Sequence, residues 1–131
     1  MMKLLRVLVI DDESVICDAC ELVLSEKGHT VTLRNNGRAG LNAIREGTYD
    51  ILLLDMKLPD IDGMDILKVV REEKPGLCTI VMTGYSSISN AVQAMRKGAD
   101  NYLAKPFTED ELVQAIEESY DSRSHAHTKQ K

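Results

Sequence analysis

Tryptophan is absent from this chain of 131 residues, phenylalanine occurs once, and aromatic residues make up 4% of the sequence. An aromatic platform for stacking bases or sugars is therefore not expected. Cationic residues are also outnumbered, because 16 Lys and Arg against 21 Asp and Glu give a net charge of −5. Since phosphate backbones need clustered cations, this balance argues against direct nucleic-acid binding by the chain.

Two kinds of targeting segment are also missing. No stretch approaches the roughly 20 apolar residues of a membrane-spanning helix, and the first residues lack the long apolar run and cleavage site of a secretory signal. Three cysteines are a small and odd number, which is typical of a reduced protein. We therefore expect a cytoplasmic protein of one domain, with no membrane partner.

What the sequence does contain is an alternation of short apolar runs and helical patterns. Continuous apolar runs at 4–10 and 51–54 are typical of strands buried on both faces, as in a parallel sheet. Strands are expected at 4–10, 30–33, 51–54, 79–82 and 101–104, and the second and fifth are weak enough to be edge strands. The order (βα)5 predicts an α/β fold, doubly wound in three layers, with helices on both faces of the sheet.

The helices have recognisable ends and faces. Ser14 is the expected N-cap of the first helix, and Thr108 with Glu111 forms a capping box before the fifth. The spacing of the apolar residues in the fourth helix predicts that Ile88, Ala91, Val92 and Met95 face inward. After about Tyr120 the chain is polar and unperiodic, so residues 1–120 are expected to form the domain and 121–131 a disordered tail or the start of a linker.

Chemically useful side chains follow four of the five strands. In order along the chain they are Asp11, Asp12 and Glu13, then Asp55, then Thr83, then Lys105. Sites in open α/β sheets form at the carboxyl ends of strands, so these groups should meet at one edge. Close carboxylates repel each other, and a hard cation such as Mg²⁺ removes that cost. Asp55 is then a natural nucleophile for a phosphoryl group.

Each of these residues also has an ordinary interpretation. Asp11 and Asp12 alone could be a solvated turn, Thr83 a turn residue before Gly84, and Lys105 a surface lysine. Because all four residues follow strands at the same edge of the sheet as Asp55, a shared site is favoured. Asp60 and Asp62 are expected to be loop charge and helix capping rather than metal ligands.

Five segments resemble the receiver domain of two-component response regulators. They are Val9-Ile10-Asp11-Asp12-Glu13, Leu53-Leu54-Asp55-Met56-Lys57-Leu58-Pro59, Asp62-Gly63, Met82-Thr83-Gly84-Tyr85 and the run from Gly98 to Phe107. The resemblance covers about residues 4–119. It implies a flavodoxin-like sandwich whose parallel strands are ordered 2-1-3-4-5.

The resemblance also implies a role for each site residue. Asp55 would be phosphorylated by a phosphohistidine of a sensor histidine kinase, with Mg²⁺ held by Asp11, Asp12, Asp55 and the backbone carbonyl of Lys57. Thr83 and Lys105 would contact the phosphoryl oxygens. Tyr102 would be the aromatic switch, a role favoured here over the packing that is usual for a tyrosine of an edge strand. The bond before Pro106 would be cis, and Tyr85 and Lys57 would tune the hydrolysis rate.

The implied function is a signalling switch rather than an enzyme acting on other substrates, since it catalyses only its own phosphorylation and dephosphorylation. The face formed by the fourth helix, fifth strand and fifth helix would contact a downstream effector domain or protein, and allows a homodimer. The segments around Thr83 and Ala91 resemble receivers of the nitrogen-regulator-like transcriptional class. The chain is then either a stand-alone receiver or the N-terminal piece of a longer regulator.

Two other functions are less consistent with the sequence. A Mg²⁺-dependent phosphatase of the haloacid-dehalogenase-like class would carry an acid two residues after its nucleophile, where this chain has Lys57. A receiver that only binds partners would not need the complete set of acids, threonine and lysine. Cys17 and Cys20 could form a redox pair, but their place inside a helix favours core packing. His29 is expected at the surface, and His125 and His127 in the tail.

Overall fold

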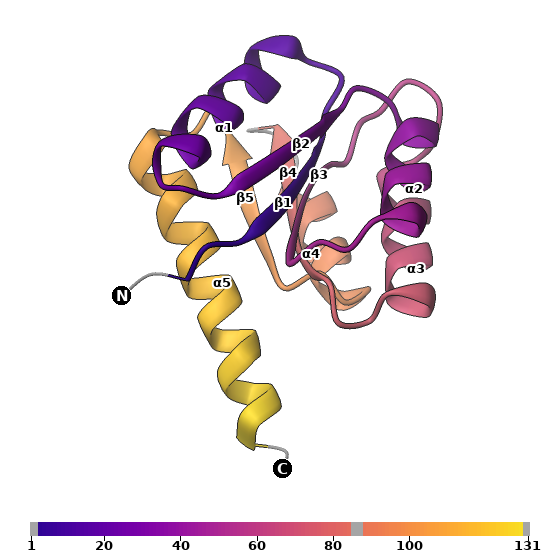
Figure 1. The fold of residues 1–131 in the computed structure, drawn as a ribbon. Coiled ribbons are helices and arrows are strands. Elements are labelled where there is room, and N and C mark those ends of the chain that lie inside the picture. Colours follow the sequence, from indigo (N-terminus) through magenta and orange to yellow (C-terminus); the bar gives the residue numbers. More distant parts are fainter. Residues whose placement is uncertain (1–2, 85–87, 130–131) are drawn as a thin grey trace.

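The parallel sheet is the frame of the molecule (Figure 1). The computed structural model describes residues 3–84 and 88–129, with side chains omitted for Ile88 and 123–129. Its strands are β1 (Arg6–Ile10), β2 (Thr30–Arg34), β3 (Ile51–Asp55), β4 (Cys78–Gly84) and β5 (Asn101–Lys105). Their order is β2-β1-β3-β4-β5, all parallel, which confirms the predicted topology and the two predicted edge strands.

Five helices alternate with these strands and cover both faces of the sheet. They are α1 (Ser14–Glu26), α2 (Gly37–Glu46), α3 (Gly63–Glu73), α4 (Ile88–Arg96) and α5 (Glu109–Lys129). Alternate residues of β1 show the division: Val7 and Val9 pack with α1 and α5, whereas Leu8 and Ile10 pack with the α2, α3 and α4 side. Burial of β1 and β3 on both faces explains their continuous apolar sequences.

The ends of the helices agree with local sequence signals, with one exception. The N–H of Thr108 donates to Glu111 Oε1 at 2.8 Å, and the N–H of Glu111 donates to Thr108 Oγ1 at 3.1 Å, as a capping box requires. Ser14, however, is the first residue of α1 and not its N-cap. Glu13 occupies that position and makes no side-chain capping bond.

The fourth helix faces the sheet differently from the prediction. Ala91 and Ala94 are buried, whereas Val92 is 45% exposed and Met95 is 39% exposed. Two small side chains let α4 approach the sheet closely, so its larger apolar residues remain at the solvent side. The prediction that Val92 and Met95 face inward is therefore wrong. The same prediction for Ile88 lies outside the side chains that the structure describes.

Two further expectations differ from the structure. His29 is 6% exposed rather than at the surface, because its Nδ1 accepts the N–H of Leu5 at 3.0 Å. Burial lowers the pKa of its imidazole, and the charge of Glu117 opposes that effect. Helix α5 continues past Tyr120 to Lys129 and projects from the body of the molecule (Figure 1), since no glycine or proline interrupts it. Residues 121–129 are therefore helical, and their place in a tail or linker stays a prediction.

The three cysteines are buried and form no disulfide with one another. Cys17 and Cys20 both lie inside α1 and pack in the core, as expected. Burial raises the pKa of both thiols, that of Cys20 to about 12, with the neighbouring Cys17 adding to the effect. Such thiols are unreactive, so the Cys-x-x-Cys spacing is a packing feature. Among the described residues, no helix is long and apolar enough to cross a membrane.

Candidate functional site

The site lies at the carboxyl ends of β1, β3, β4 and β5, where the sheet register brings distant residues together. Ile10 pairs with Leu54, so Asp11 and Asp55 end neighbouring strands. Asp55 pairs with Met82, and Thr83 pairs with Ala104, which sets Thr83 and Lys105 beside the acids. A cleft of about 240 Å³ at this edge is lined by Asp12, Asp55, Thr83 and Lys105 among others.

Three carboxylates form a cluster that can hold a cation. One oxygen from each of Asp11, Asp12 and Asp55 lies within 4.8 Å of the others. Asp11 is fully buried and Asp55 is 4% exposed, whereas Asp12 is exposed. The Oδ2 of the buried Asp11 pairs with Lys105 Nζ at 2.7 Å. Three carboxylates at this distance, two of them buried, carry more negative charge than Lys105 neutralises, and their oxygens fit a hard divalent ion such as Mg²⁺.

Asp55 is held in place and electrostatically strained. Its Oδ1 accepts the backbone N–H of Lys57 at 3.1 Å. Burial raises the pKa of Asp55 to about 6, helped by the charges of Asp11 and Asp12 and opposed by the Lys57 N–H and by Lys105. The ionised form needed for nucleophilic attack is thus costly here without a further positive charge.

Lys105 is the cation already present in the cluster. Its Nζ lies 2.7 Å from Asp11 Oδ2, 2.9 Å from Glu13 Oε1 and 3.5 Å from Asp55 Oδ2. Burial alone lowers the pKa of Lys105, but hydrogen bonds to Asp11 and Glu13 and the charge of Asp55 raise it above its ordinary value. Lys105 is therefore charged at neutral pH. The peptide bond between Lys105 and Pro106 is cis, as expected.

The other predicted site residues lie at varying distances from the cluster. Thr83 is buried and lines the cleft. The side chain of Lys57 is exposed at its rim. Tyr102 is 48% exposed and does not line the cleft; it borders a separate groove of about 320 Å³ with Ala91, Val92, Met95 and Arg96. Tyr85 lies outside the described residues.

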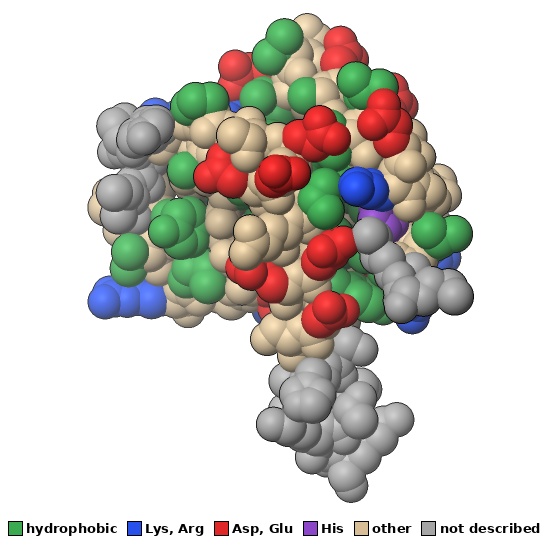
Figure 2. Space-filling model, turned by 90° about the vertical axis from the view of Figure 1, so that its left-hand side faces the viewer, with side chains coloured by type: hydrophobic (Ala, Val, Ile, Leu, Met, Phe, Trp, Pro, Cys, Tyr) green, Lys and Arg blue, Asp and Glu red, His purple; other side chains and the backbone are tan. Residues whose placement is uncertain are grey.

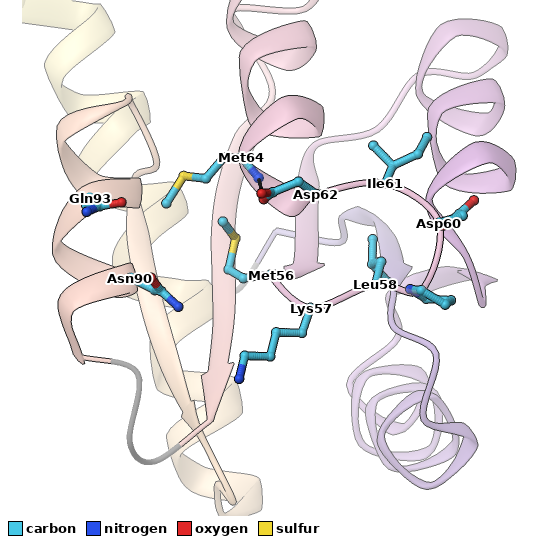
Figure 3. A pocket seen from close by; sticks show the side chains of 10 residues that line it. Met56, Lys57, Leu58, Asp60, Ile61, Asp62, Met64, Asn90 and Gln93 are labelled. Atoms are coloured by element: carbon cyan, nitrogen blue, oxygen red, sulfur yellow. Dashed lines mark hydrogen bonds between the residues drawn. The ribbon is translucent and has the colours of Figure 1, made fainter.

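The sequence placed Glu13 at this edge without assigning it a role, and in the structure it pairs with Lys105 at 2.9 Å. A second contributor, Asn90, was not predicted. Asn90 of α4 lines both the cleft and an adjoining groove of about 540 Å³ (Figure 3). Nothing in the local pattern distinguishes it from other polar helix residues, because its role depends on how α4 packs.

Comparison with known proteins gives a consistent result. Residues 7–117 match the family model of the response regulator receiver domain. The transcriptional regulatory protein ZraR of Escherichia coli K12 is 34% identical over 122 residues, which are 93% of this chain and 27% of ZraR. The transcriptional regulatory protein DltR of Streptococcus agalactiae is 40% identical over 112 residues, 86% of this chain and 50% of DltR.

Solved structures agree with these matches. NtrX from Brucella abortus superposes with a TM-score of 0.92 at 28% identity, over 96% of this chain and 29% of NtrX, in agreement with the expected likeness to nitrogen-regulator receivers. A CheY-like receiver domain protein from Methanospirillum hungatei superposes with a TM-score of 0.88 at 32% identity, over 95% of this chain and 99% of that protein. The chain spans about a quarter to a half of the length of the curated relatives named above.

Proposed function

Because this chain belongs to the response regulator receiver domain family, we propose that it is a phosphorylation switch whose acceptor is Asp55. The observation that carries the proposal is the convergence of Asp11, Asp12 and Asp55 with Lys105 at one edge of the sheet. Solvated turns and a surface lysine would not bring four charged residues from three strand ends together.

The phosphoryl donor is a phosphohistidine of a sensor histidine kinase. A carboxylate oxygen of Asp55 forms a bond to phosphorus while the phosphorus–nitrogen bond breaks, and the electron pair of that bond leaves with the imidazole. Asp55 is held for this attack by the N–H of Lys57. We infer that the same residues promote the later hydrolysis, so the chain catalyses reactions only on itself.

The residues of the cluster fit Mg²⁺, which when bound neutralises charge on the phosphoryl oxygens. Asp11, Asp12, Asp55 and the backbone carbonyl of Lys57 are the proposed ligands. Thr83 and Lys105 complete the site as donors to the phosphoryl oxygens. Lys105 is now bound to Asp11 and Glu13, so it must exchange these partners for the phosphoryl group.

Phosphorylation is read out on the face formed by α4, β5 and α5. Thr83 moves toward the phosphoryl group, and Tyr102 turns inward into the space that Thr83 leaves. In this structure Tyr102 is 48% exposed beside Val92 and Met95, which are also exposed. This apolar surface supports a changing contact with an effector, or with a second copy of the chain.

The side of the molecule that carries α5 is acidic. Figure 2 shows acidic side chains gathered over this side. The exposed acids of α1 and α5 include Asp18, Glu21, Glu109, Asp110, Glu111, Glu118 and Asp121. Such a surface repels a phosphate backbone, which supports a readout through protein contacts. ZraR and DltR are named as transcriptional regulatory proteins. We accordingly propose that the whole protein controls transcription, and that a separate effector carries out this step. The absence of a disulfide among the three cysteines supports a reducing, cytoplasmic location.

The test uses a small acyl-phosphate donor and intact-mass measurement. With Mg²⁺ the wild-type chain should gain one phosphoryl group. The Asp55→Asn variant should gain none, and neither should the wild-type chain when Mg²⁺ is removed with a chelator. Labelling that persists in Asp55→Asn would move the acceptor elsewhere, and sustained turnover of unrelated phosphate esters would favour a phosphatase.

A further inference from the structure

Asp60 makes a contact that its place in the sequence did not predict. It lies in the loop between β3 and α3, yet its carboxylate accepts two backbone N–H groups of α2. The N–H of Gly37 donates to Oδ1 at 2.7 Å, and the N–H of Arg38 donates to Oδ2 at 2.9 Å. These bonds, that from Arg38 foremost, lower the pKa of Asp60. Figure 3 shows Asp60 at the end of the groove that lies nearest α2, with its carboxylate turned toward that helix.

The contact is built into both elements. The first N–H groups of a helix have no partner within the helix. Asn36 accepts one of them, from Ala39 at 2.8 Å, and Asp60 accepts those of Gly37 and Arg38. A Cβ on residue 37 would lie 2.9 Å from Ile61 Cβ and 3.0 Å from Asp60 Oδ1. Glycine at this position therefore allows the loop to lie directly against the start of α2.

The same loop carries the residue whose carbonyl is the proposed metal ligand. Lys57 donates its N–H to Asp55 and forms an isolated antiparallel bridge with Asp62. Asp62 in turn caps α3 by accepting the N–H of Met64 at 2.9 Å. The base of the loop is thus fixed by Asp55 and α3, and its far end is fixed to α2 by Asp60.

From this arrangement we propose that Asp60 is a positioning residue, which fixes the loop so that the backbone carbonyl of Lys57 is presented to Mg²⁺. The inference rests on the proposed function of the carboxylate cluster. Asp60 itself does not bind the ion, because its carboxylate is turned toward α2. Residues that hydrogen-bond to a metal ligand commonly change metal affinity by about 10- to 100-fold. Asp60 acts on the Lys57 carbonyl through the loop, so we expect an effect at the lower end of this range.

The test compares Asp60→Ala with Asn36→Ala in the full chain. Both variants remove a cap of α2, but only Asp60→Ala releases the loop. Mg²⁺ affinity is measured by titration calorimetry with the metal alone, and hydrogen exchange is measured at the Lys57 and Gly63 amides without metal. We expect Asp60→Ala to weaken Mg²⁺ binding by about tenfold and to speed exchange at both amides. Asn36→Ala should leave the Mg²⁺ affinity and the exchange rates of both amides close to wild type. Urea unfolding should show that this variant has nevertheless lost stability.

The outcomes separate this inference from the function on which it rests. Wild-type Mg²⁺ affinity in Asp60→Ala, or an equal loss in Asn36→Ala, would overturn the positioning role and leave the switch intact. A wild-type chain that binds no Mg²⁺ would overturn the proposed function and the positioning role with it. Asp60→Asn is a second variant that conserves shape and keeps an oxygen acceptor. Its Mg²⁺ affinity should lie between those of wild type and Asp60→Ala.

Discussion

Replacing Asp55 by asparagine should stabilise the metal-free protein at neutral pH. In the folded chain the pKa of Asp55 rises from 3.8 to about 6, chiefly because the carboxyl is buried. Each pKa unit corresponds to about 1.4 kcal/mol. The ionised carboxylate therefore lowers the free energy of unfolding by about 3 kcal/mol, and Asp55→Asn should recover much of this.

The pH dependence follows from the direction of that shift. An acid whose folded pKa is raised contributes its stability below the unfolded value, near pH 4, and loses that stability as the pH rises through about 6. Asp55→Asn and wild type should consequently be similar near pH 4, and the difference should be complete by about pH 7. Mg²⁺ should then raise the free energy of unfolding of wild type but have little effect on the variant.

Urea unfolding followed by circular dichroism in chelator-treated buffer provides the measurement. Asp121→Asn is the matched control, because it removes an acid from the exposed surface of α5. Its free energy of unfolding should follow that of wild type between pH 4 and 8. An Asp55→Asn variant no more stable than wild type at pH 7 would refute the reasoning, since the buried charge would then carry no cost.

Three further outcomes are expected. Thr83→Ala should still accept a phosphoryl group, but the Tyr102 ring signals in its nuclear magnetic resonance spectrum should no longer shift on phosphorylation; a preserved shift would remove Thr83 from the switch. His29 has a pKa lowered by burial, and its Nδ1 accepts the Leu5 N–H. The free energy of unfolding measured with urea should therefore fall as the pH drops below about 6.5, and His29→Asn should reduce this pH dependence. Thr108→Ala should lower the free energy of unfolding by about 1 kcal/mol in the same assay, because it removes half of the capping box.

Some features were predictable from sequence because they depend on neighbouring residues. The apolar runs of β1 and β3 follow from burial on both faces, and the capping box of Thr108 and Glu111 is a contact over three residues. The meeting of Asp11 with Asp55 required only the order of the strands, because parallel strands end at the same edge.

Other features depend on contacts between distant parts of the chain. Val92 and Met95 share the spacing of an inward face, but α4 packs through the smaller Ala91 and Ala94. The burial of His29 depends on an N–H donor 24 residues away. Asp60 caps a helix that precedes it by 23 residues. A periodic pattern carries no information on such partners.

The carboxylate cluster has one residue that should carry the phosphoryl group, and mapping it is the most direct test. The chain is incubated with an acyl-phosphate donor and Mg²⁺, the acyl phosphate is reduced with borohydride, and peptide mass spectrometry locates the altered residue. We expect conversion at Asp55 and no conversion once Mg²⁺ is chelated. Conversion at Asp11, Asp12 or any other acid, or conversion that does not depend on the metal, would contradict it.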